Sequence, residues 1–470
     1  MTVDYTGDLS QFVSTSIQKY VLGSHTLRVD CIAARLDPPA QLFEEPSTSQ
    51  QLDRLVLISK VGSSPLIVFG MKVSEFVVCE TGSDSARSVH AYIEKIDSTG
   101  FFDHSLARSE ASAGQDFYSI SRSTLFGYIQ HLYDRYKSQA PEIWVHTFAR
   151  SMPEYLFPDS KLNPGKYRAS NPGAGLVRWW KSTLDQAMAK MDPQPISEAF
   201  WLVPGEGEAL ARRFFEAPGC VLKWNWGLPW PAHGSAAVLV PRFPDDPKGR
   251  IIADSLSTAA KPSGKPTLTV KSLVNMLECS GESSNQTTCY FVVRMQAAHN
   301  ADEPSCGMDR SREGCTDSNL CDHKAFEAIT KELGSGCYSS QQNAVQSSDR
   351  LIKLFRETPG TTCSHIRIEN VPKAKGLDET AVNSSTAPAT TITSLQGLIK
   401  KKSKTAPNTV VTSSIPDGSA TSSIASTSVV ESRSNDIQSL VKRKQRPPMQ
   451  TNPDSEPAKR MKPGAGNDCE

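Results

Sequence analysis

The chain has 470 residues and a formal net charge of +1, so its bulk charge predicts no nucleic-acid or membrane partner. Hydrophobic residues make up 38% of it, which is low for a chain that folds throughout and indicates a disordered portion. The longest apolar runs, such as residues 65–71, are far shorter than the ~20 residues that span a bilayer. The polar N-terminus does not resemble a signal peptide, and we expect a soluble protein.

The cysteines indicate free thiols in a reducing compartment, because there are eleven of them and no secretion signal precedes them. Cys306, Cys315, Cys321 and His323 lie close together in the sequence and raise the possibility of zinc. Their spacing lacks the Cys-x-x-Cys knuckle of structural zinc sites, so we predict no metal.

The first part of the chain is predicted to form a short helix followed by an antiparallel meander. Residues 12–20 have a helical pattern and residues 27–34 a strand pattern. Three apolar runs then follow, at 55–58, 66–79 and 89–96, and turns rich in Gly, Ser and Pro separate them.

The next elements alternate helices with short core segments. Ser121 is expected to cap a helix over 122–136, a strand follows at 142–148, and helices follow at about 174–190 and 206–215. Trp179 and Trp180 are adjacent in one helix and cannot both face the core, so one of them should line a groove. Further core segments at 268–277 and 290–295 and helices at 324–333 and 342–355 complete the folded part.

We therefore predict a mixed α/β fold over residues 1–370, with a central, largely antiparallel sheet flanked by helices. Residues 371–470 are predicted to be a disordered basic tail, because Ser, Thr, Pro, Lys and Ala dominate them. The tail contains two similar motifs, Leu-Gln-Gly-Leu-Ile-Lys-Lys-Lys from residue 395 and Ile-Gln-Ser-Leu-Val-Lys-Arg-Lys from residue 437. They are nuclear import signals, segments that order on an acidic partner, or chance similarity.

A stiff, charged corner at residues 241–250 stands out because three prolines fix its backbone. Asp245, Asp246, Lys248 and Arg250 lie within it, between a strand-like run at 236–240 and two isoleucines. Charges at such a place are costly unless they pair or take part in chemistry. The alternative is a solvated surface turn.

Two local patterns suit an anionic ligand. Asp97 ends a strand and precedes Ser98-Thr-Gly, a turn whose N–H groups and hydroxyls could bind phosphate. Arg122 lies at the start of the helix over 122–136, which suits a pyrophosphate. Together with the aromatic residues and the acidic pair, these patterns indicate a nucleotide-containing cofactor and a cationic substrate.

Several stretches together resemble the fungal histone acetyltransferases of the regulator-of-Ty-transposition family, which modify histone H3 at the lysine at position 56. The resemblance rests on Val-His-Ala-Tyr-Ile-Glu-Lys-Ile-Asp-Ser-Thr-Gly at 89–100, Glu-Tyr-Leu-Phe-Pro-Asp-Ser at 154–160 and Leu-Val-Arg-Trp-Trp at 176–180. It continues through Val-Pro-Gly-Glu at 203–206 and Phe-Pro-Asp-Asp-Pro-Lys-Gly-Arg at 243–250. A fainter similarity to the CREB-binding-protein acetyltransferases occurs at 92–98 and at the Trp-Trp helix.

The resemblance implies an acetyltransferase-like fold that binds acetyl-CoA as its co-substrate. It implies that Asp246 or Asp97 accepts the substrate proton, that Trp180 forms a dry wall beside the substrate, and that Lys248 is autoacetylated. The implied acetyl-CoA ligands are Ile96, Asp97, Ser98, Arg122, Ser123, Thr124, Leu125, Phe126, Phe148, Met152, Tyr167, Arg168, Ala169 and Trp180.

The function that follows is a nuclear histone H3 lysine acetyltransferase. In the family, histone chaperones of the nucleosome-assembly and anti-silencing types present H3–H4, and the enzyme serves replication-coupled nucleosome assembly and genome stability. An alternative is a non-catalytic scaffold that binds histone chaperones. A third reading is nucleic-acid binding through the basic clusters at 400–404 and 442–446, although the folded part shows no recognition motif.

Overall fold

The computed structural model describes residues 8–44, 49–79, 86–102, 118–163, 165–166, 172–215, 220–259, 268–279, 287–296 and 320–370. All of them lie in the first of two compact units, Met1–Val382, and the second unit is Asn383–Glu470. The two tail motifs, Cys306, Cys315 and the predicted ligands Tyr167, Arg168 and Ala169 lie outside the described residues.

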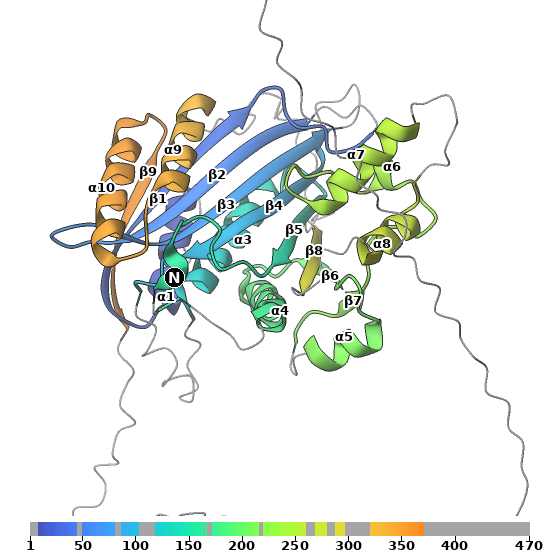
Figure 1. Ribbon diagram of the computed structural model, residues 1–470, viewed down its shortest axis with the longest axis horizontal. Coiled ribbons are helices and arrows are strands. Elements are labelled where there is room, and N and C mark those ends of the chain that lie inside the picture. The colour runs from blue at the N-terminus through green and yellow to red at the C-terminus, as the bar shows by residue number, and fades with distance from the viewer. Residues whose placement is uncertain are drawn as a thin grey trace, which may run out of the picture. The chain divides into compact units, whose positions relative to one another are not determined.

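A nine-stranded sheet forms the centre of this unit, with the strand order β7-β6-β8-β5-β4-β3-β2-β1-β9 (Figure 1). Neighbouring strands are antiparallel except for the parallel pairs β4–β5 and β6–β7. The predicted meander and the largely antiparallel sheet are thus confirmed. The strands are β1 (Gly23–Leu36), β2 (Ser49–Lys60), β3 (Leu66–Cys79), β4 (Ala86–Ser98), β5 (Glu142–Arg150), β6 (Ile196–Leu202), β7 (Trp224–Trp226), β8 (Thr288–Gln296) and β9 (Thr362–Asn370).

Helices flank the sheet, as predicted (Figure 1). They are α1 (Leu9–Tyr20), α3 (Ile120–Tyr136), the short 3-10 helix η2 (Ser160–Leu162), α4 (Pro172–Lys190), α5 (Glu208–Phe215), α6 (Ala236–Leu239), α7 (Pro247–Ala259), α8 (Val270–Cys279), α9 (His323–Ser335) and α10 (Gln341–Glu357). Within the described ranges, none of these helices is long and apolar enough to cross a membrane.

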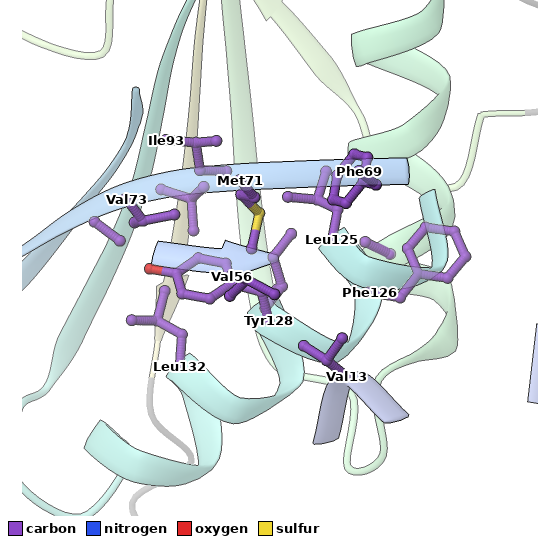
Figure 2. Packing of buried hydrophobic residues seen from close by; sticks show 14 of the residues in the cluster. Val13, Val56, Phe69, Met71, Val73, Ile93, Leu125, Phe126, Tyr128 and Leu132 are labelled. Atoms are coloured by element: carbon purple, nitrogen blue, oxygen red, sulfur yellow. The ribbon is translucent and has the colours of Figure 1, made fainter. Parts of the chain in front are cut away.

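Helix α3 packs its apolar face on the middle of the sheet. Figure 2 shows Leu125, Tyr128 and Leu132 of α3 beside Val56 and Met71 of the sheet. All five side chains are almost completely buried in the main core. Because α3 follows β4 and precedes β5, this packing fixes the β4–α3–β5 crossover that joins two parallel strands.

A buried polar network also holds α3 in place. The Glu75 carboxylate accepts hydrogen bonds from Arg54 Nε at 2.8 Å, from the Tyr128 hydroxyl at 3.2 Å and from the Tyr136 hydroxyl at 3.0 Å. Burial raises the pKa of both tyrosines above the ordinary value, so both remain hydroxyl donors. A buried carboxylate with these partners specifies one position of α3 on the sheet.

The opposite face of the sheet carries the predicted acidic residues, and a β-bulge determines which side chains reach it. Lys72 pairs with Lys95 and Val73 pairs with Ile93, so Glu94 is the extra residue between them. A bulge of one residue shifts the alternation of side chains. Asp97, beyond the bulge, consequently lies on the same face as Tyr92, before it.

Three local predictions were wrong. The cap of α3 is Ser119, not Ser121, because the Ser119 hydroxyl accepts from the backbone N–H of Arg122. The run at 236–240 forms the short helix α6 instead of a strand, and the proline corner ends where Pro247 begins α7. Proline is well suited to a first helical position because no N–H is needed there.

Strands β6, β7 and β9 were not expected from the sequence. β7 is only three residues long, and β9 has only the two buried residues Ile366 and Ile368 to indicate a strand. Both β7 and β9 are edge strands, for which the alternating pattern is short or weak.

Candidate functional site

The candidate site lies at one edge of the sheet, where two parallel strands end beside a helix N-terminus. β4 and β5 run parallel, so their carboxyl ends, near Asp97 and Arg150, meet at the same edge. The N-terminus of α3 follows β4 and returns to this edge. Its first turn contains no acidic residue, so the partial positive charge of the helix end is not cancelled there.

The Asp97 carboxylate holds together the loops around this edge. One oxygen accepts backbone N–H bonds from Tyr155, Leu156 and Phe157 at 2.8, 2.9 and 3.3 Å. The other accepts from the Ser98 N–H and from the Lys166 ammonium, each at 2.8 Å. A carboxylate has about four lone-pair sites, so these five donors saturate it.

The turn after Asp97 does not present its N–H groups as the sequence suggested. The Ser98 N–H binds the Asp97 side chain, and the Thr99 N–H donates to the carbonyl of Val68 at 3.1 Å. The Thr99 hydroxyl donates to the carbonyl of Ile67 at 3.0 Å. These three donors bind other groups of the protein and are therefore not available to a phosphate.

Of the four charged residues at the proline corner, Asp246 and Lys248 are buried and paired, so the alternative of a solvated surface turn does not hold for them. The Lys248 ammonium donates to the Asp246 carboxylate, and both side chains are almost completely buried, at 3% and 1% exposure. The backbone N–H of Lys248 donates to the other Asp246 oxygen at 2.9 Å. Burial lowers the pKa of Lys248, and the Asp246 charge opposes this shift. Asp245 and Arg250, in contrast, are exposed.

Aromatic side chains surround the Asp246–Lys248 pair. The Lys248 ammonium lies 4.0 Å from the ring centroid of Tyr290, and Tyr290 stacks on Phe148 at 4.8 Å. Tyr92 stacks on Phe243 at 4.5 Å, and the carbonyl of Phe243 accepts from the Asp246 N–H. The face is thus dry and aromatic around one buried ion pair.

Each of the two candidate carboxylates affects the pKa of a tyrosine. Burial raises the pKa of Tyr92 well above its ordinary value, and the charges of Asp246, Asp245 and Glu94 add to the shift. Burial likewise raises the pKa of Tyr155, and the Asp97 charge adds to that shift.

Apart from Asp97 and Trp180, the predicted acetyl-CoA ligands fall into three groups. Ile96, Ser98 and Phe148 are half-buried and Met152 is exposed, and all lie near the ends of β4 and β5. The side chains of Ser123, Thr124, Leu125 and Phe126 are buried, and Arg122 is the half-buried member of this second group. The Arg122 guanidinium donates to Gln186 of α4 at 3.1 Å. The third group, 167–169, lies outside the described residues.

Trp180 is 5% exposed and belongs to the main core, while its neighbour Trp179 is half-buried. The two rings meet edge to face, 5.1 Å apart. Trp179 is therefore the more accessible of the two, and the role of Trp180 as a wall beside the substrate stays a prediction.

Sequence reasoning missed Tyr92, Tyr290, Phe243 and His146 as site residues. Tyr92 and Phe243 lie within the motifs that carried the resemblance, but nothing in the sequence shows that their rings stack. His146 lies on β5 and Tyr290 on β8. In the pairing of these strands His146 is opposite Val292 and Phe148 is opposite Tyr290, and only this register shows that His146 and Tyr290 share a face. Among the described residues, no group of three or more His, Cys, Asp or Glu side chains is placed to hold a metal ion.

Three buried histidines predict how stability depends on pH. Burial lowers the pKa of His90 from 6.5 to about 3 and those of His131 and His146 well below the ordinary value. The unfolded chain then binds protons that the folded chain does not, so this stability is complete above about pH 6.5 and is lost as the pH falls toward 3. Each such histidine costs ~1.4 kcal/mol per pH unit in that window.

Between pH 6 and pH 4 the unfolding free energy falls as the pH falls, and we expect His90→Phe to reduce the slope of this fall by ~1.4 kcal/mol per pH unit. Denaturant titrations at several pH values measure this slope. The exposed His233→Gln serves as the control and should leave the slope unchanged. An unchanged slope for His90→Phe would show that His90 is protonated in the folded protein.

A sequence model of the histone acetyltransferase KAT11-type domain matches residues 136–353. Histone acetyltransferase rtt109 of Aspergillus flavus is 26% identical over 282 residues, which cover 54% of this chain and 47% of that protein. The chain therefore spans about half the length of that relative. Rtt109 of Schizosaccharomyces pombe is 24% identical over 296 residues, which cover 59% of this chain and 69% of that protein. RTT109 of Candida albicans is 33% identical over a shorter stretch of 105 residues, 22% of this chain and 26% of that protein.

Among solved structures, the crystal structure of Rtt109 from Aspergillus fumigatus superposes with a TM-score of 0.57 at 19% identity. The superposition covers 77% of this chain and 100% of that chain. At this identity the match shows the fold, and it confirms the predicted acetyltransferase-like architecture.

Proposed function

Because the chain belongs to the fungal Rtt109-type histone acetyltransferases, we propose that it transfers the acetyl group of acetyl-CoA to lysine side chains of histone H3. One observation in the structure supports this proposal independently of the family: Asp246 and Lys248 form a buried ion pair, and the Lys248 ammonium lies against the Tyr290 ring.

The substrate amine must lose a proton before it can react. A lysine with a pKa near 10.4 is only about one part in a thousand neutral at physiological pH. Asp246 is the better candidate to accept this proton, because Asp97 is saturated by five donors from the protein. The rings of Tyr290, Tyr92 and Phe148 favour an incoming ammonium group through cation–π attraction and disfavour water.

While Lys248 is charged, its ammonium group pairs with the Asp246 carboxylate. Acetylation would remove the Lys248 charge, and the amide N–H could then donate one hydrogen bond to Asp246. The remaining acceptor capacity of Asp246 would be available to the substrate ammonium. Acetylation of Lys248 is thus proposed as an activating step that releases the carboxylate.

Acetyl-CoA supplies an activated thioester carbonyl, and its CoA moiety carries phosphate groups through which it can be bound. The residues at this edge fit such a ligand in one respect: the uncancelled N-terminus of α3 and the half-buried Arg122 suit its phosphates. Burial lowers the pKa of Arg122, and an anion beside it would oppose that shift. Ile96, Phe148 and Met152 offer apolar contacts near the same edge.

The finer role is proposed from the resemblance. We place the enzyme in the nucleus and assign it the H3 lysine at position 56, with tail lysines as further substrates. Histone chaperones of the nucleosome-assembly and anti-silencing types would present H3–H4, and the tail motifs would provide docking segments. This role belongs to replication-coupled nucleosome assembly and genome stability.

The test is transfer of labelled acetyl from acetyl-CoA to H3–H4, with and without an added chaperone. Labelled H3 and stimulation by the chaperone support the proposal. If H3 and Lys248 both remain unlabelled while a chaperone still binds the protein, the alternative of a non-catalytic scaffold takes its place.

Lys248→Arg is expected to reduce transfer at least ~10-fold, because the guanidinium keeps its charge beside Asp246 and cannot be acetylated under these conditions. Lys248→Gln should retain more activity than Lys248→Arg, since a neutral amide resembles the acetylated side chain. Initial rates on H3–H4, with mass spectrometry of position 248, measure both effects. Full turnover by Lys248→Arg would contradict the activating role of acetylation.

A further inference from the structure

Four nearly parallel rings pack together in one cluster on the face that carries Asp246, and Trp230 is its half-buried member. Trp144 and His90 stack with centroids 5.9 Å apart, His90 and His146 follow at 5.3 Å, and Trp230 stacks on His146 at 6.3 Å. The planes differ by at most 21° across these contacts. His90 is 5% and His146 is 2% exposed, and the proposed function so far uses neither.

Hydrogen bonds join the two histidines to a serine. Ser88 Oγ lies 3.0 Å from His90 Nε2, and His90 Nδ1 lies 3.1 Å from His146 Nε2. A neutral imidazole has one N–H donor and one acceptor nitrogen, so the chain can run in either direction. In one direction His146 Nδ1 ends the chain as a donor, and in the other it ends as an acceptor.

The end of this chain is an unpartnered atom. His146 Nδ1 is buried and, within the described part of the chain, has no hydrogen-bond partner. A buried polar atom without a partner costs ~1–3 kcal/mol, so such an atom needs a physical explanation. A group that forms a hydrogen bond with it in another state of the protein would provide one.

Lys248 is the neighbour that can change its chemical state. The Phe243 ring lies 5.1 Å from His146, and the Phe243 carbonyl accepts the N–H of Asp246. His146 also precedes Phe148 by two residues on β5, and Phe148 stacks on the Tyr290 ring that the Lys248 ammonium contacts. The Lys248 charge is among the causes that lower the pKa of His146.

We propose that His146 is a positioning residue for acetylated Lys248, in which His146 Nδ1–H donates to the acetyl carbonyl while Asp246 accepts from the amide N–H. This inference rests on the proposed function, because it takes Lys248 as an acetylation site. In forming the acetyl-lysine, the ammonium first loses a proton to solvent. The amine nitrogen then bonds to the acetyl carbon, the carbon–sulfur bond of acetyl-CoA breaks, and the second amine proton leaves with the sulfur as free CoA thiol.

The serine–histidine chain makes this role compatible with both states of Lys248. An ammonium favours the bare acceptor form of Nδ1, and an acetyl carbonyl requires the donor form. The change moves each imidazole proton from Nε2 to Nδ1 and turns the Ser88 hydroxyl from acceptor to donor, with no net gain of protons. The chain would thus adapt to acetylation without placing a charge in the core.

The experiment combines two changes in four full-length proteins. Position 248 carries lysine or an acetyl-lysine incorporated during synthesis, so the enzyme's own activity is not needed, and position 146 carries histidine or phenylalanine. His146→Phe keeps a flat ring in the cluster and removes both ring nitrogens. We expect acetylation of Lys248 to change the thermal midpoint of unfolding less favourably, by ~2 °C or more, in the His146→Phe protein than in the protein that keeps His146.

Two further variants separate a hydrogen bond from simple packing. His146→Asn places an amide nitrogen near the position of Nδ1 and should recover about half of the coupling. His131→Phe is the matched control, because His131 is also buried but lies on α3 against Phe12. It should give an additive cycle with acetyl-lysine.

Nitrogen NMR of histidine-labelled protein provides the direct readout. Acetyl-lysine at position 248 should move the His146 proton to Nδ1, with the signal assigned by its loss in His146→Phe. An additive cycle or an unchanged tautomer would overturn the proposal. Failure of the proposed function would appear separately, as absence of acetyl transfer from acetyl-CoA to H3 and to Lys248.

Discussion

Asp246→Asn is expected to reduce acetyl transfer to H3 by ~10²-fold or more, the range found when a positioned general base is removed. Asn cannot accept the proton that the substrate ammonium must lose, and among the described residues Asp97 is already saturated by hydrogen bonds. Initial rates with labelled acetyl-CoA and H3–H4 measure this loss. Activity within threefold of wild type, roughly 0.65 kcal/mol, would remove Asp246 from the mechanism.

The same substitution also breaks a buried ion pair, and this effect must be separated from catalysis. Asp246 and Lys248 are both almost fully buried, so removing one charge leaves the other uncompensated, at a cost of ~3–5 kcal/mol in unfolding free energy. Adding Lys248→Gln to Asp246→Asn leaves two neutral amides that can hydrogen-bond. We expect this double variant to recover most of the stability and none of the transfer activity.

Asp245→Asn is the matched control for the stability measurement. Its side chain is 66% exposed, and it pairs with Lys95 at 4.0 Å. Exposed pairs of this kind contribute little, so the unfolding free energy should change by less than ~0.5 kcal/mol. A large loss in this variant would indicate that the 243–248 turn depends on both carboxylates.

The sequence identified the acidic corner correctly because local rules constrain it strongly. Prolines fix the backbone, and charges between apolar segments require partners or a chemical role, so the residues alone marked the corner, and the resemblance singled out Asp246 and Lys248 within it. The meander was predictable for the same kind of reason, since its apolar runs alternate and have clear turns between them. The resemblance then supplied the chemistry.

The rest of the site depends on contacts between distant segments. Nothing near Asp97 in the sequence indicates that residues 155–157 would donate three N–H groups to it, because 58 residues separate Asp97 from Tyr155. The bulge at Glu94, which puts Asp97 on the same face as Tyr92, also depends on pairing with β3. His90 and His146 are 56 residues apart, and only the parallel pairing of β4 with β5 brings them together.

Asp97→Asn is the second substitution with a large expected effect, and its cause is loss of an anchor. The amide keeps one oxygen but replaces the other with an NH₂ donor. In either orientation the NH₂ group faces donors, namely the N–H groups of 155–157 or Lys166 and the Ser98 N–H. We expect a loss of ~3 kcal/mol or more in unfolding free energy, because a buried charge-assisted network is left unsatisfied.

The activity of Asp97→Asn should fall through acetyl-CoA binding more than through the proton-transfer step. The anchored loop leads through Lys166 directly into residues 167–169, which the family resemblance assigns to the co-substrate. We therefore expect KM for acetyl-CoA to rise at least ~10-fold, while the pH dependence of kcat keeps the wild-type shape. A shifted pH profile with unchanged KM would instead make Asp97 the proton acceptor.

Lys166→Met removes one of the five hydrogen bonds that Asp97 accepts. It removes the ammonium that Asp97 shares with Ser160, and it leaves the three N–H donors of 155–157 in place. If Asp97 acts as an anchor, Lys166→Met should raise KM for acetyl-CoA in the same direction as Asp97→Asn but less. The double variant should lose less than the sum of the single losses, because both substitutions remove the same contact. If Asp97 were the proton acceptor, removing Lys166 would instead leave KM for acetyl-CoA unchanged and would change kcat.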